Sequence, residues 1–344
     1  MLIGIVFGGE SFEHEISIIS AIAVKNVINE NLNFIFCDKD REFYLIEEKN
    51  MYAKFFSSMS YKKSKKLTLK NGGFTISGMF SDEFLKCECY INLIHGADGE
   101  DGKLSALFDF FEVPYIGPRL EACIMSYNKE FTKLLAQKAH VKVLPYEVLN
   151  KSSLPTLPYP FILKPLRLGS SIGISVVRDQ SELEYAMEVA FEFDDGVIIE
   201  PYYESIKEFN LAGCMVDGEI EYSIIEEPKK TKMLDFDQKY KKDGDDKSQV
   251  VEANIGYSLK SDMKDAFYRI YNCGFEGSLI RCDFFEINGE VYLNEINPNP
   301  GSLASHLFDS FRFSEIIRKM AKNPLKQRKI NVEYRFIEQI TSNK

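Results

Sequence analysis

The sequence has no excess of basic residues and no long apolar run. Its 344 residues include 42 Lys and Arg against 52 Asp and Glu, which gives a net charge of -10 and a pI near 5.2. Proteins that bind nucleic acids or anionic membranes usually present a basic surface, so this balance argues against both partners. No apolar stretch approaches the roughly 18 residues of a membrane-spanning helix, and Met1 leads directly into an apolar strand rather than a signal segment. We therefore expect a cytoplasmic protein that binds neither nucleic acid nor membrane.

Cysteines in pairs are also lacking. An exported protein held by disulfides usually has an even number at short spacings, whereas the cysteines here are odd in number and scattered through apolar segments. The Cys87-x-Cys89 spacing does not fit a zinc knuckle. We expect reduced core thiols at Cys37, Cys87, Cys89, Cys123, Cys214, Cys273 and Cys282.

Two common nucleotide-binding fingerprints are missing. The turn at Gly8-Gly9 lacks the third glycine of a dinucleotide-binding loop, so a dehydrogenase has only this strand and turn in its favour. The Gly-Ser loop at 169–173 is not a Walker A loop, because that loop carries its lysine near its end and leads into a helix. Small residues with free amides can still fold over phosphates, and Lys164 places a positive charge before the loop. An ordinary hairpin turn is the alternative.

The residues that are present predict a chain of α/β and α+β domains. Buried-strand patterns at 2–7, 34–37 and 89–94 alternate with helical patterns at 16–28 and 103–111, which is typical of a Rossmann-like parallel sheet. Residues 47–86 follow neither pattern and are expected to be a surface hairpin or excursion.

Two smaller α+β units are expected after this sheet. The first has helices at 120–138 and 181–193 and strands at 143–149, 159–163 and 197–200. The second has hairpins at 208–225 and 281–297 and helices at 261–273 and 311–320. Residues 226–250 are rich in charge and poor in apolar side chains, which favours a long lid loop. The expected domains are 1–118, 119–202 and 203–344.

The hairpin at 281–297 gathers oxygen ligands. Glu295 and Asn297 project from one face of their strand, and Arg281 and Asp283 share a face of the partner strand. A two-residue Asn-Gly loop would place Asp283 and Glu295 on opposite faces, whereas a three-residue loop with a left-handed glycine would place them on one face. If they meet, the oxygens favour Mg²⁺ over a softer metal. A solvated acidic hairpin is the alternative.

Charged clusters at 11–15 and 95–102 follow two strands of the predicted parallel sheet. Open α/β sheets bind ligands at the carboxyl ends of their strands, and the glycines of the second cluster allow close approach of a ligand. The alternatives are structural: Glu13 and Glu15 also suit the first turn of a helix, and His95 suits a hydrogen-bonded strand end.

Taken together, these segments resemble the D-alanine–D-alanine ligase family of the ATP-grasp superfamily. Residues 8–15, 95–102, 164–173 and 281–301 match the motifs of that family in its order. The resemblance implies a three-domain ATP-grasp fold with ATP held between the second and third domains. It also implies two reaction steps, in which ATP phosphorylates the carboxylate of one D-alanine and the amine of a second attacks the acyl phosphate. Homodimers and a role in peptidoglycan precursor synthesis are usual in the family.

The resemblance also assigns roles to residues. ATP would be held by Lys129, Lys164, Ser171, Glu200, Tyr203, Glu208 and Lys239, with two Mg²⁺ or Mn²⁺ ions on Asp283, Glu295 and Asn297. Arg281 and the amide of Gly301 would stabilise the acyl phosphate, and Glu13 would receive the ammonium of the first D-alanine in a network with Ser170 and Tyr240. His95 would lie near that substrate. Tyr240 favours a dipeptide product over an ester.

One segment departs from the family pattern. Many members carry Thr/Ser-x-Ser-Leu where this chain has residues 302–307, so the carboxylate of the second substrate would be held by Ser305, His306, Leu307 or nearby amides. Two other functions remain open. Another ATP-grasp carboxylate-amine ligase shares the metal and phosphate motifs, but Glu13, His95 and Tyr240 favour D-alanine. A regulatory nucleotide-binding protein would lack part of the metal set, and none of it is missing.

Overall fold

The apolar segment that opens the chain is the centre of an eight-stranded sheet. In the computed structural model, which describes residues 1–344 except 79–80, 229–251, 327–329, 333 and 342–344, β1 (Leu2–Gly8) runs parallel to β2 (Asn31–Cys37) and β7 (Cys89–Asn92). β8 (Tyr115–Ile116) extends the parallel half, and α1 (His14–Val24) and α3 (Lys103–Phe110) provide the crossovers. The Rossmann-like prediction is confirmed, because strands covered on both faces require continuous apolar runs.

The hairpin predicted within residues 47–86 is present, and its strands extend this sheet rather than lying apart from it. β3 (Phe43–Ile46), β4 (Lys65–Lys70), β5 (Gly73–Ile76) and β6 (Glu83–Phe84) continue it in antiparallel order, with α2 (Ala53–Ser57), η1 (Glu48–Asn50) and η2 (Ser60–Lys63) between them. The expected hairpin exists as β4–β5. It joins the sheet because Leu67 and Phe74 bury their side chains in its core, whereas the lysines of β4 face solvent.

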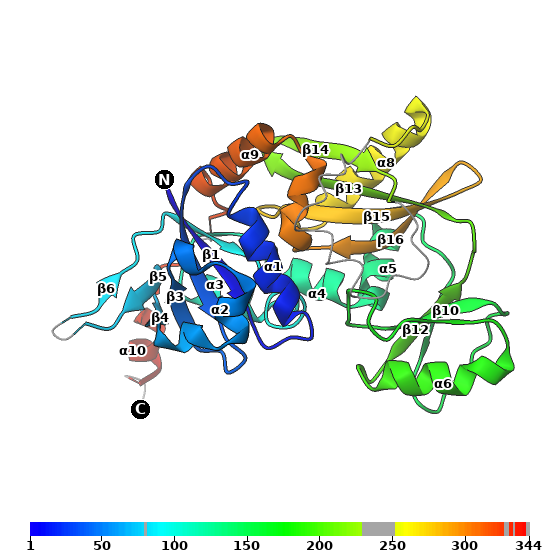
Figure 1. Ribbon diagram of the computed structural model, residues 1–344, viewed down its shortest axis with the longest axis horizontal. Helices are drawn as coiled ribbons and strands as arrows, with labels where there is room; N and C mark the ends of the chain where they lie inside the picture. The colour runs from blue at the N-terminus through cyan, green and yellow to red at the C-terminus, as the bar shows by residue number, and fades with distance from the viewer. Residues whose placement is uncertain (79–80, 229–251, 327–329, 333, 342–344) are drawn as a thin grey trace.

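Two four-stranded antiparallel sheets follow. The second sheet, in the order β11-β10-β12-β9, contains β9 (Glu147–Leu149), β10 (Phe161–Pro165), β11 (Ser175–Val177) and β12 (Val197–Pro201), and α6 (Gln180–Phe191) covers it. The third sheet, in the order β14-β13-β15-β16, contains β13 (Lys207–Val216), β14 (Glu219–Glu226), β15 (Ile280–Ile287) and β16 (Glu290–Asn297). Figure 1 shows the second sheet and α6 as a separate lobe below the third.

The predicted helix at 120–138 is two helices, so the single-helix prediction was wrong. α4 (Leu120–Tyr127) ends at Asn128, whose backbone is extended (φ -92, ψ 120), and α5 (Lys129–Lys138) begins there. The Asn128 side chain accepts hydrogen bonds from the amides of Glu130 and Phe131, a normal N-cap arrangement. Both helices pack with α8 (Tyr257–Tyr271) against the third sheet, and α5 thereby brings Lys129 and Lys133 to the second sheet.

The C-terminal segment returns to the first sheet. η3 (Gly301–Leu307) and α9 (Ser310–Lys322) bury Leu303, Phe313 and Ile317 in the core that contains Ile3 of β1, while α10 (Arg335–Thr341) follows with its apolar side chains exposed. The first and third sheets therefore share one core (Figure 1). Within the described residues, no helix has both the length and the apolar content to span a bilayer.

Candidate active site

A β-bulge decides which way the acidic residues of the β15–β16 hairpin point. The turn has two residues, Asn288 and Gly289, both left-handed (φ 53 and 80), since Ile287 pairs with Glu290. On that basis alone Asp283 and Glu295 would lie on opposite faces. The register shifts between Asp283 and Phe284, however, so that Asp283 pairs directly with Glu295. Neither of the two alternatives drawn from the sequence included this bulge, which inserts one extra residue in β16.

The bulge gathers the expected metal ligands around one guanidinium. Arg281 donates from Nε to Asp283 Oδ1 (2.6 Å) and from Nη2 to Oδ2 (2.8 Å), and Asn297 Nδ2 donates to Oδ2 (3.0 Å). Burial raises the pKa of Asp283 although Arg281 opposes the shift. Two carboxylates on one face with the amide oxygen of Asn297 form a hard-oxygen donor set, which fits Mg²⁺ or Mn²⁺.

Two lysines and one glutamate form a buried ionic cluster at the junction of α5, β10 and β12. Lys133 Nζ lies 2.5 Å from Glu200 Oε1, and Lys164 Nζ lies 2.7 Å from Oε2. Burial alone would raise the pKa of Glu200, but the two ammonium groups outweigh it and hold the pKa at about 2. Burial lowers the pKa of both lysines, and the charge of Glu200 raises it. The net pKa of Lys164 is raised, whereas that of the more deeply buried Lys133 is lowered.

The extra residue of the bulge joins this cluster to the metal face. Asn294 is that residue: its carbonyl accepts from Lys133 Nζ (3.1 Å), and its side-chain Oδ1 accepts from Lys164 Nζ (3.3 Å). The next residue is Glu295. The bulge therefore brings Asn294 against Lys133 of α5 and Lys164 of β10, and it places Glu295 opposite Asp283.

The other residues expected to bind ATP lie around the same cluster. Lys129 donates to the Leu168 carbonyl (2.6 Å) at the base of the Gly-Ser loop, where Ser170 and Ser171 are left-handed (φ 55 and 61). Glu208 lies near enough for its charge to raise the pKa of Lys164. Tyr203 is 44% exposed just beyond β12.

A second buried group of polar side chains lies where β1 and β7 end. Ser170 donates to Glu13 Oε1 (2.5 Å), so the Gly-Ser loop reaches the first domain. Burial, and then the charge of Glu100, raises the pKa of Glu13. His95 contacts Ser20 Oγ through Nε2 (2.9 Å) and Glu100 through Nδ1 (3.4 Å), and burial lowers its pKa.

This group is tied to the segment after the hairpin. The Ser302 amide donates to Ser20 Oγ (3.1 Å), and Asn299 Nδ2 donates to the Ile94 carbonyl (3.2 Å). Residues 302–304 have left-handed backbone conformations (φ 49, 53 and 50). Non-glycine residues rarely adopt this conformation in succession, and such strained segments cluster at functional sites. These contacts tie the residues on either side of Gly301 to α1 and to the end of the strand segment before His95.

The residues expected to bind the second amino acid all lie in η3, but they differ in exposure. Leu307 is 1% exposed and its side chain belongs to the core, so only its backbone could meet a ligand. Ser305 is partly buried and His306 is exposed, with His306 Nε2 lying 3.9 Å from Glu226 Oε2. Lys239 and Tyr240 lie outside the described residues.

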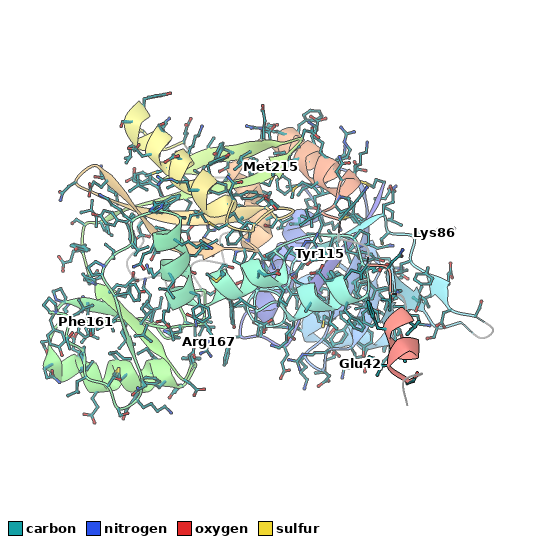
Figure 2. All side chains as sticks on the ribbon, turned by 180° about the vertical axis from the view of Figure 1, so that it is seen from behind. Glu42, Lys86, Tyr115, Phe161, Arg167 and Met215 are labelled. Atoms are coloured by element: carbon teal, nitrogen blue, oxygen red, sulfur yellow. The ribbon has the colours of Figure 1, made fainter. Side chains whose placement is uncertain are left out.

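A cavity of about 800 Å³ gives access to the first-domain side of the site. Residues on either side of Glu13 line it, together with Gly96, Arg167 and Asp194. Figure 2 shows Arg167 on the side of the Phe161 lobe that faces the first sheet. The cavity therefore lies between the first sheet and the lobe formed by the second sheet and α6.

Comparison with known proteins gives the family. Residues 2–118 match the family described as D-ala D-ala ligase N-terminus, and residues 131–314 match D-ala D-ala ligase C-terminus. A D-alanine–D-alanine ligase of Campylobacter concisus is 57% identical over 344 residues, covering 100% of this chain and 99% of that protein. The chain belongs to the D-alanine–D-alanine ligase family.

Solved structures agree with this assignment. The D-alanine–D-alanine ligase of Helicobacter pylori has a TM-score of 0.84 at 41% identity, covering 95% of this chain and all of that one. A D-Ala:D-Ser ligase of Enterococcus faecalis has a TM-score of 0.73 at 23% identity, which shows the shared fold alone. The ATP-grasp prediction for the fold of this family member is confirmed.

Sequence reasoning missed three residues of the site in this family member. Lys133 follows Lys129 by four positions and so lies on the same helix face, which was an available signal. Glu100 lies inside the 95–102 motif but was assigned no role. Asn294 gave no signal, because its importance comes from a bulge that the residue pattern does not reveal.

Lys133→Met should destabilise the protein by about 3 kcal/mol, because it removes one partner of a buried ionic cluster. Urea unfolding followed by circular dichroism would measure the change. Lys142→Met is the matched control, since Lys142 pairs with Glu290 (2.5 Å) at the surface and should leave the unfolding midpoint unchanged. Equal midpoints for the two variants would show that the cluster contributes no net stability.

Glu100→Gln should remove a pH dependence of stability. Burial raises the pKa of Glu100 from its ordinary 4.5 to about 8. The native state therefore keeps a proton that the unfolded state has lost, and the wild-type free energy of unfolding should fall as pH rises from about 4.5 to about 8. Urea unfolding at several pH values should give a flatter profile for this variant. Glu121→Gln, at an exposed position of α4, should retain the wild-type slope.

Proposed function

We propose that the protein joins two D-alanine molecules into D-alanyl-D-alanine at the expense of ATP, through a D-alanyl phosphate. The observation that carries this proposal is the pairing of Asp283 with Glu295 beside Arg281, next to Lys164 of the second sheet. Family membership and a Campylobacter relative named D-alanine–D-alanine ligase support the choice of substrate.

In the first step the carboxylate oxygen of one D-alanine attacks the γ-phosphorus of ATP, and ADP leaves. Lys129 and Lys164 would bind the phosphates, and Glu13 would orient the attacking substrate through its ammonium. Asp283, Glu295 and Asn297 would hold two Mg²⁺ or Mn²⁺ ions, which would neutralise the charge of the transferred phosphoryl group. Arg281, Asp283, Glu295 and Asn297 are only half-buried in the free protein, so bound substrates would have to displace the water that could hydrolyse the acyl phosphate.

In the second step the amine of another D-alanine attacks the carbonyl carbon of the acyl phosphate. The new C–N bond forms, the attacking nitrogen gives its proton to the departing phosphate, and the C–O bond to phosphate breaks. Arg281 of β15 and the amide of Gly301, at the start of η3, would stabilise the oxyanion of the tetrahedral intermediate. The product would serve peptidoglycan precursor synthesis in the cytoplasm, with the enzyme acting as a homodimer.

Glu295→Ala should lower the rate of phosphate release by about 10²–10³-fold, because it removes an electrostatic contact to the transferred phosphoryl group. The assay is phosphate release from Mg·ATP with D-alanine, L-alanine, D-lactate or no addition, with the product identified by mass. Glu290→Ala, at the exposed start of β16, is the control and should retain wild-type activity.

Each outcome of this assay separates the candidate functions. D-alanine-dependent release with formation of the dipeptide supports the proposal. ATP binding without D-alanine-dependent release would point to another ATP-grasp carboxylate-amine ligase. ATP binding without release for any amino acid tested would favour a regulatory nucleotide-binding protein.

A further inference from the structure

Glu226 lies at the end of a polar row that crosses the whole third sheet. Glu226 of β14 pairs with Asn210 of β13, Asn210 pairs with Asp283 of β15, and Asp283 pairs with Glu295 of β16. Residues directly opposite each other in antiparallel strands project from the same face. The Glu226 carboxylate therefore points to the face of the proposed metal site, two strands or about 10 Å away from Asp283.

Glu226 is an ionised group with loosely held partners. Its Oε2 accepts from Asn210 Nδ2 (3.0 Å) and lies 3.9 Å from His306 Nε2, while its side chain is 19% exposed. Burial would raise its pKa, but the contacts with His306 and Asn210 and the charge of Arg281 outweigh burial and lower it. By contrast, Arg281 binds Asp283 through two hydrogen bonds. Glu226 thus retains acceptor positions for a ligand.

The segment η3 contacts Glu226 at one end and, at the other, the helix that follows Glu13. On one side of η3, the Ser302 amide contacts Ser20 of α1, the helix that follows Glu13. On its other side, His306 contacts Glu226 of β14. The segment after Gly301 is therefore held by α1 at Ser302 and approaches Glu226 at His306. A ligase of two amino acids needs two ammonium sites, one for each substrate.

We propose that Glu226 receives the ammonium group of the second, acceptor amino acid. His306 lies beside it and meets the carboxylate of the same substrate. A carboxylate and an imidazole 3.9 Å apart match the opposite charges of a small zwitterion, whose two charged groups are separated by a single carbon. This proposal rests on the proposed ligase function and adds a residue that the family resemblance did not assign.

The test is steady-state kinetics of Glu226→Gln, which keeps the size of the side chain and its contact with Asn210 but removes the charge. We expect KM for the second D-alanine to rise at least tenfold, while KM for the first D-alanine and for ATP stays within twofold. D-alanyl phosphate trapped with hydroxylamine should form at the wild-type rate. Glu221→Gln is the control on the same strand, because Glu221 pairs with Arg312 of α9 (2.5 Å) and should leave all three constants unchanged.

Glu226→Asp separates a charge effect from a structural one. This variant keeps the charge but shortens the side chain away from Asn210, so its KM for the second D-alanine should lie between those of the wild type and Glu226→Gln. The opposite order, or an increase below twofold for Glu226→Gln, would overturn the proposal. Loss of trapped acyl phosphate in Glu226→Gln would also overturn it. Failure of the wild-type protein to release phosphate with D-alanine would instead reject the proposed function.

Discussion

One buried carboxylate shared by two buried ammonium groups sets the arrangement of the nucleotide-binding face. Glu200 has 2% of its side-chain surface exposed and Lys133 has 1%, so neither charge is solvated by water. An unpaired charge in such a place costs several kcal/mol, so the elements that carry the three groups must stay together. α5, β10 and β12 therefore have one acceptable packing. Lys133 and Lys164 then use their remaining donors on Asn294, which extends the same constraint to the third sheet.

The bulge at Asn294 satisfies two requirements with one residue. The ionic cluster needs acceptors from β16, and the proposed metal site needs Glu295 opposite Asp283. A regular hairpin with the observed two-residue turn would meet neither, because the period of two along a strand would turn Glu295 to the other face. The bulge shifts the register by one residue between Asp283 and Phe284, and this shift adds Glu295 to the row that the other strand pairs form from Glu226, Asn210 and Asp283.

The shared core of the first and third sheets determines where the two amino acids could meet the phosphates. η3 and α9 pack against β1, β7 and β13, so the left-handed segment after Gly301 lies beside Ser20 and His95. Glu13 accepts a hydrogen bond from Ser170, in the loop between β10 and β11 of the second sheet. Each of the three sheets thus supplies part of the site, and the side chains between them are largely removed from water, which strengthens every charge interaction there.

Much of the architecture followed from the sequence alone, because strand and helix patterns and glycine turns are local properties. The parallel sheet around β1, the hairpin at 281–297 and the family resemblance were all predictable in this way. Tertiary structure decided the rest. The break at Asn128 depends on a side-chain cap, and the joining of residues 65–76 to the first sheet depends on core contacts of Leu67 and Phe74. The pairing of Asp283 with Glu295 and the roles of Lys133 and Asn294 depend on a register shift stabilised by charges from another sheet, and no pattern within one strand can encode a partner that lies more than a hundred residues away.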